Sequence, residues 1–94
     1  FHDKTFIVWG AGQLAYMMIK HGQHLEKSKI AFFVDKDKKK QGKRLCDIVI
    51  KHPDFIKQVD YPIIIASSRF YNEIYNELID MGISKDRIMD SLII

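Results

Sequence analysis

A glycine-rich turn between an apolar run and a helical pattern constrains the fold of this 94-residue chain more than any other feature. The residues FIVW precede the motif GAGQLA (residues 10–15), and an amphipathic pattern continues to about His21. In this spacing Gly10 permits a tight turn after a strand, Gly12 lets a phosphate approach the backbone, and Ala15 lets the helix lie close to the strand. The first amides of such a helix are unpaired and carry the positive end of its dipole. The stretch therefore predicts a strand, a turn and a helix whose N-terminus forms an anion site.

The remaining sequence repeats the alternation of apolar runs and helical patterns. Further strands are predicted at residues 29–35, 47–50, 63–66 and 87–90, and helices at 13–21, 53–59 and 69–81. Continuous apolar runs are typical of strands buried on both faces, and a strand–helix–strand unit is right-handed and parallel. The sequence therefore predicts the α/β class, with a three-layer Rossmann-like parallel sheet of about five strands and helices on both faces.

The hydrophobic spacing of the two longer helices predicts which side chains they bury. The buried face of the first helix is expected to consist of Leu14, Met17, Met18 and His21. The buried stripe of the last helix is expected to consist of Tyr71, Ile74, Tyr75, Leu78 and Ile79. Ser67 and Ser68 are expected to cap the last helix, while Gly22 and Gly82 end the first and the last helix.

Ligands of doubly wound sheets bind beyond the carboxyl ends of the strands, where the strand order reverses. Three segments are expected to meet there: the glycine turn, the end of the second strand, and the residues after the strand at 63–66. The predicted ligand-binding residues are Gly10, Ala11, Gly12, Gln13, Leu14, Asp35, Lys36, Ser67 and Ser68. Arg69 is a further candidate for pairing with a phosphate. The alternative is that the two serines only cap a helix and that Arg69 is solvated.

Asp35 lies 23 residues after Gly12, near the separation of about 20 residues at which an acid accepts hydrogen bonds from a ribose hydroxyl. A carboxylate there repels a 2′-phosphate, and it therefore favours NAD or another unphosphorylated ribose. The neighbouring Lys36 weakens this preference. The alternative is an acid that faces solvent at the end of a strand.

Composition and charge narrow the remaining functional classes. The net charge of +3 is mostly local to a basic run at residues 36–44, which we interpret as a solvated loop because no aromatic residues are interleaved with it. We therefore expect no nucleic-acid partner. The alternative to a solvated loop is that this run attracts the phosphates of a nucleotide. Cys46 is the only cysteine, so an internal disulfide is excluded, and this fits a reducing cytoplasm and a small buried residue. No run of about 20 apolar residues predicts a membrane span, and a cytoplasmic location is expected.

The sequence contains no constellation typical of a catalytic or metal site. Tyr16 and Lys20 form Y-x-x-x-K, which resembles the catalytic pair of short-chain dehydrogenases. In that family the pair lies on a helix far downstream, whereas here it lies on the helix of the glycine turn. His21 and His24 have no further ligands at metal-site spacing. We therefore predict no catalytic or metal-binding residues, and expect any chemistry elsewhere in a longer protein.

Five stretches together resemble a Rossmann-like module of bacterial polysaccharide biosynthesis proteins. They are IVWGAGQLA, FFVDKDKKKQGK, DIVI, YPIIIASS and MGISKDRI. Related modules are attached to sugar acetyltransferases, sugar dehydratases and sugar methyltransferases. The resemblance implies binding of a nucleotide-sugar, or of NAD where it is retained, through Gly10, Gly12, Asp35 and the serines at 67 and 68. Ala15 replaces the third glycine of the pattern, which the pattern tolerates.

The same resemblance implies a binding module rather than an independent enzyme. The acetyltransferases have a catalytic β-helix that this chain lacks, and the C-methyltransferases place their methyl-donor site in a separate domain. Residues 1–94 are thus expected to form one domain of a larger protein, with a nucleotide ligand and the other domains as partners. The alternatives are an accessory or substrate-holding domain of a methyltransferase or other transferase, and a nucleotide sensor that acts by forming a homo-oligomer.

Overall fold

The computed structural model describes residues 5–21 and 26–89, which contain six strands and two α-helices. The strands are β1 (Phe6–Trp9), β2 (Ile30–Val34), β3 (Arg44–Leu45), β4 (Ile48–Lys51), β5 (Ile63–Ile65) and β6 (Ile88–Met89). The α-helices are α1 (Gln13–His21) and α2 (Tyr71–Asp80). Short 3-10 helices span η1 (Lys27–Lys29), η2 (Pro53–Gln58) and η3 (Lys85–Arg87). The predicted α/β class is therefore confirmed.

The strands form one sheet in the order β3-β4-β2-β1-β5-β6. All neighbouring pairs are parallel except β3 and β4, which form an antiparallel hairpin. The chain moves outward from β1 through β2 to β4, then crosses back to β5 on the other side of β1. Without β3, this is the strand order of the doubly wound Rossmann fold. The strand order therefore reverses between β1 and β5. The sheet is mostly parallel, as predicted, and has one strand more than the predicted five.

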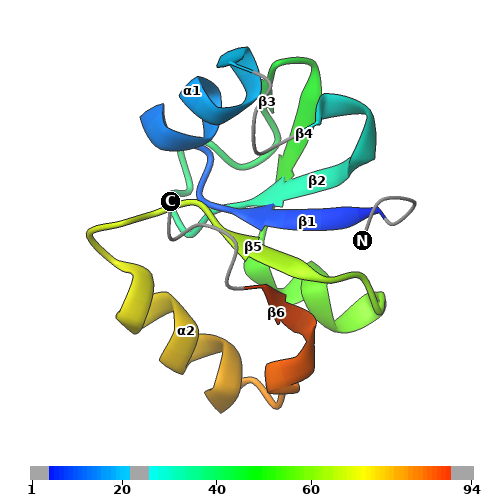
Figure 1. Cartoon of the computed structure of the whole chain (residues 1–94), viewed down its shortest axis with the longest axis vertical. Helices are drawn as coiled ribbons and strands as arrows, with labels where there is room; N and C mark the ends of the chain where they lie inside the picture. The colour runs from blue at the N-terminus through cyan, green and yellow to red at the C-terminus, as the bar shows by residue number, and fades with distance from the viewer. Residues whose placement is uncertain (1–4, 22–25, 90–94) are drawn as a thin grey trace.

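Helices cover both faces of the sheet, as predicted (Figure 1). Alternate residues of β1 point to opposite layers: Val8 lies in the cluster that α1 covers, whereas Ile7 and Trp9 lie in the cluster that α2 and η2 cover. The centre of the sheet has no solvent-facing side, so Phe33 and Ile65 are fully buried. Burial of each such side chain contributes about 1.5–3 kcal/mol, which explains why the strands are continuous apolar runs.

The buried face of α1 differs from the prediction. Ala15 and Met18 are the buried residues of this helix, whereas Leu14 and Met17 are each 38% exposed and His21 is exposed. The contact with the sheet runs along Ala11, Ala15 and Met18, at positions i, i+4 and i+7. Small residues lie closest to the sheet in the first turns, because the glycine turn brings the start of the helix against its own strand, and Leu14 and Met17 therefore point outward. The predicted end of the helix at residue 22 lies outside the described residues.

The β3–β4 hairpin was not predicted, because residues 36–44 were interpreted as a polar loop. Its turn is formed by Cys46 and Asp47, with φ angles of 52° and 67°. Two adjacent residues with positive φ are typical of a type I′ turn, the turn whose twist matches that of the two strands in a two-residue hairpin. Such turns usually contain a glycine, and this one does not. Cys46 was predicted to be buried and is only partly so, because it lies in this turn.

Helix α2 begins two residues later than predicted. Its N-cap residue is Phe70, which makes no side-chain capping bond, and Ser67 instead accepts a hydrogen bond from the Phe70 N–H at 3.0 Å. Of the predicted stripe only Leu78 is fully buried, but the other four residues pack against the same layer of the core. Gly82 has a φ of 86° directly after the last turn, as the predicted helix end requires.

Candidate functional site

The glycine turn after β1 is held between the two neighbouring strands. Gly10 has a φ of 111° and donates a backbone hydrogen bond to Val34 O of β2 at 2.9 Å. A Cβ at Gly10 would lie 2.8 Å from the carbonyl oxygen of Ala66, which follows β5. Both the backbone conformation and this close approach therefore require glycine.

Gly12 is constrained in a different way. Outside its chain neighbours, and within residues 5–21 and 26–89, a Cβ at Gly12 would meet only the ammonium of Lys40, at the ordinary contact distance of 3.6 Å. The space above Gly12 is thus open to small groups, at the point where α1 begins at Gln13. The first turn of an α-helix leaves its N–H groups without partners inside the helix, so this position offers donors to an anion.

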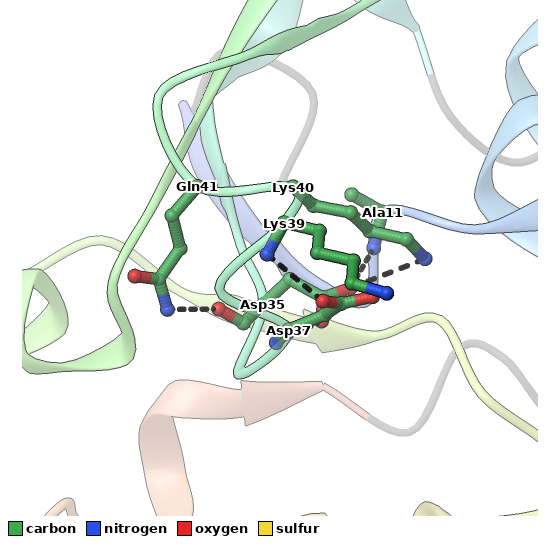
Figure 2. Close-up of polar contacts among 6 residues, drawn as sticks. All are labelled: Ala11, Asp35, Asp37, Lys39, Lys40 and Gln41. Atoms are coloured by element: carbon green, nitrogen blue, oxygen red, sulfur yellow. Dashed lines mark hydrogen bonds and ion pairs between the residues drawn. The ribbon is translucent and has the colours of Figure 1, made fainter.

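Asp35 follows β2 and reaches the glycine turn, as its spacing predicts (Figure 2). Its Oδ2 accepts a hydrogen bond from the Ala11 N–H at 2.9 Å, and its Oδ1 accepts one from the Asp37 N–H at 2.9 Å. The side chain is 17% exposed. A carboxylate oxygen can accept more than one hydrogen bond, so Asp35 holds the turn and keeps acceptor capacity toward the cleft.

Lys40 is a residue of the site that the sequence analysis did not select. Its ammonium lies 3.9 Å from Asp35 Oδ2, and Figure 2 shows the side chain directed to the carboxylate and the turn. The sequence carries four lysines between positions 36 and 40, and no pattern distinguishes the one that folds back. The distinction comes from the tertiary path of the loop.

The opposite side of the site precedes α2. Ser67 is partly buried, whereas Ser68, Arg69 and Phe70 are exposed. The guanidinium carbon of Arg69 lies 5.1 Å from the ring centre of Phe70. The two sides are linked by an ion pair of 3.0 Å between Lys36 Nζ and Glu77 Oε1 of α2.

These segments enclose one cleft of about 530 Å³ at the carboxyl ends of β1, β2 and β5. Eight of the nine predicted ligand-binding residues line it: Gly10, Gly12, Gln13, Leu14, Asp35, Lys36, Ser67 and Ser68. The ninth, Ala11, is buried and contributes its amide to Asp35. Lining residues that sequence reasoning missed are Trp9, Asp37, Lys40, Ala66, Phe70, Glu73, Ile74 and Glu77. Arg69 also lines the cleft.

The cleft combines donors for an anion with acceptors for hydroxyl groups. The start of α1 and the cations of Lys40 and Arg69 supply the donors, whereas Asp35 and Glu73 supply carboxylates. Within residues 5–21 and 26–89, no group of three His, Cys, Asp or Glu side chains is placed to hold a metal ion. The same residues contain no helix that is long and apolar enough to cross a membrane.

The strand order and the cleft at its reversal define a Rossmann-like α/β domain. The family described as C2185-like, N-terminal, matches residues 2–89, and the chain belongs to this family. A comparison with curated proteins finds no match. Among solved structures, the chain is similar to a crystal structure of UDP-D-quinovosamine 4-dehydrogenase from Vibrio fischeri. The TM-score is 0.58 and the identity 18%, over 83% of this chain and 70% of that chain, so the likeness is one of fold.

Proposed function

We propose that this chain is a nucleotide-binding module of a protein that acts in sugar or polysaccharide biosynthesis, with a nucleotide-sugar or NAD as its ligand. One observation carries the proposal. Three segments that are far apart in the sequence, around Gly12, Asp35 and Ser67, line a single cleft at the reversal of the strand order. This is the place where open α/β sheets bind their ligands.

The chemistry of the cleft supports a ligand with a phosphate and hydroxyl groups. A phosphate fits above Gly12, where the backbone leaves space and the first amides of α1 point outward. Ribose or sugar hydroxyls would donate to the carboxylates of Asp35 and Glu73, while the Ser67 and Ser68 hydroxyls can donate or accept. The similar solved structure is that of a UDP-sugar dehydrogenase, a name that is compatible with both ligand classes.

A second function is an accessory or substrate-holding domain of a methyltransferase or other transferase. The contact of Asp35 with Ala11 and Lys40 favours this alternative, because it satisfies the glycine turn without a ligand. In this alternative the cleft is a feature of the fold that binds no nucleotide, and the domain acts by docking to other parts of the protein. The cytoplasmic location expected from the single cysteine fits both functions.

Gly12→Val separates the two functions by calorimetric titration with UDP-N-acetylglucosamine and with NAD. If the cleft binds a nucleotide, the wild-type chain binds one of the two and Gly12→Val weakens it by about tenfold or more, because its branched side chain fills the phosphate position. The control is Ser28→Val, at an exposed position in η1, which precedes the amino-terminal end of β2 and lies away from the cleft; it should not change the affinity. A wild-type chain that binds neither ligand at millimolar concentration would contradict nucleotide binding.

A further inference from the structure

Lys40 differs from Lys38 and Lys39, its neighbours in the same loop. Lys38 and Lys39 are exposed, whereas the Lys40 side chain is 40% exposed and lines the cleft. We propose that Lys40 binds the phosphate of the ligand and that it offsets the negative charge of the neighbouring Asp35. This inference rests on the proposed function and adds a specific phosphate-binding side chain to it.

The loop holds Lys40 in place on both sides. The Lys40 N–H donates to Asp37 O at 2.9 Å, and the Lys43 N–H donates to Lys40 O at 3.0 Å. The Gln41 side-chain amide donates to Asp35 O at 2.8 Å, which fixes the loop to the end of β2 (Figure 2). A side chain whose backbone is already ordered loses less conformational freedom when it binds a ligand.

The position of the ammonium matches the open space at the glycine turn. Apart from Gly12 and its two chain neighbours, Lys40 Nζ is the only heavy atom of the described residues that lies within 4 Å of the Cβ position at Gly12. A phosphate that approaches the first amides of α1 therefore meets this ammonium. Lysine binds phosphate as a point charge, and it complements helix-terminal amides in the same way at other phosphate sites.

The carboxylate of Asp35 lies beside the proposed phosphate position, so Lys40 also offsets its negative charge. Asp35 would repel a phosphate at this position if its charge were not compensated. Lys40 lies 3.9 Å from its Oδ2 and provides that compensation. Loss of Lys40 therefore removes an attraction and leaves a repulsion, so the affinity should recover in part when Asp35 is also made neutral.

The experiment measures the affinity for whichever of UDP-N-acetylglucosamine and NAD the wild-type chain binds. Lys40→Met is expected to weaken binding roughly tenfold, the size of a lost charge-assisted hydrogen bond. Lys38→Met is the matched control and should change the affinity less than twofold. Lys40→Arg keeps the charge and should restore most of the affinity. Thermal unfolding of each variant checks that the fold is intact.

The double variant tests the role of Asp35. Asp35→Asn combined with Lys40→Met should bind about fivefold more tightly than Lys40→Met alone, because one charge repulsion at about 4 Å is removed. If the double variant binds no more tightly than Lys40→Met alone, Lys40 does not offset the charge of Asp35, and this part of the inference is overturned. If the wild type binds and Lys40→Met equals Lys38→Met, the inference fails while the proposed function stands. If the wild type binds neither ligand, both fail.

Discussion

The wall of the cleft that follows β1 is held by backbone contacts, whereas the wall that precedes α2 is formed mainly by exposed side chains. The glycine wall comprises residues 10–12 with Asp35 and Lys40. Its turn donates hydrogen bonds to Val34 O of β2 and to the Asp35 carboxylate. The α2 wall comprises residues 67–70 and the first turn of α2, where Ser67 makes one local bond to Phe70. The first wall is thus fixed by backbone hydrogen bonds to its neighbours, whereas the second is formed by a surface segment with fewer such bonds.

The largest loss of stability is expected for Gly10→Ala, which adds a side chain inside the glycine wall. The new Cβ would lie 2.8 Å from Ala66 O on a backbone with a φ of 111°. The combined clash and backbone strain should lower the free energy of unfolding by about 4 kcal/mol. Gly12→Ala is the matched control, and urea unfolding should show a loss below about 1 kcal/mol. Equal losses would refute the distinction between the two glycines.

A smaller loss of stability is expected for Leu78→Ala, which removes packing between α2 and the core. Leu78 is the buried residue of α2, so its truncation leaves a cavity under the helix. The expected loss of stability is about 3 kcal/mol. Ile79→Ala, at a half-buried position on the same helix, should cost clearly less in the same urea unfolding experiment. If the two variants are equally stable, α2 is not anchored as described.

Asp35→Ala tests whether a side chain helps to hold the glycine wall. The change removes the acceptor of the Ala11 and Asp37 N–H groups and leaves the first of them poorly solvated. Stability should fall by about 2 kcal/mol. Asp86→Ala, at an exposed position in η3, serves as the control and should cost less than about 0.5 kcal/mol. A neutral Asp35→Ala would mean that the turn is stable without the carboxylate.

The smallest effect is expected where the two walls are linked. Lys36 and Glu77 form an ion pair of 3.0 Å, but their side chains are 64% and 38% exposed. An exposed pair is screened by water and salt, so Lys36→Met should cost at most about 0.5 kcal/mol. A double-mutant cycle with Glu77→Gln measures the coupling. A coupling above about 1 kcal/mol would show that the link between the walls is structural.

The fold and the position of the glycine wall were predictable from the sequence. The glycine wall is encoded locally, because an apolar run, two glycines and a small residue suffice to specify a strand, a turn and a helix. Asp35 was found by its spacing from Gly12, which the length of one strand–helix–strand unit sets. Eight of the nine residues predicted in this way line one cleft in the structure.

The features that were missed depend on long-range contacts. Lys40 is distinguished from its neighbours only by the path of the loop that follows β2. The β3–β4 hairpin has a turn at Cys46 and Asp47 without the usual glycine. The orientation of α1 was mispredicted because hydrophobic spacing favours large residues, whereas close packing at the turn selects Ala11 and Ala15. Each of these is a case in which tertiary packing overrides a local pattern.

The most direct test of nucleotide binding is an NMR titration of the labelled chain. NAD, NADP, a UDP-sugar and S-adenosylmethionine are added in turn, and the amide shifts are followed. We expect a UDP-sugar or NAD to shift the amides of residues 10–14, Asp35 and residues 67–69, which lie on both walls of the cleft. If none of the four compounds moves these amides at millimolar concentration, the cleft is not a nucleotide site and the docking function takes its place.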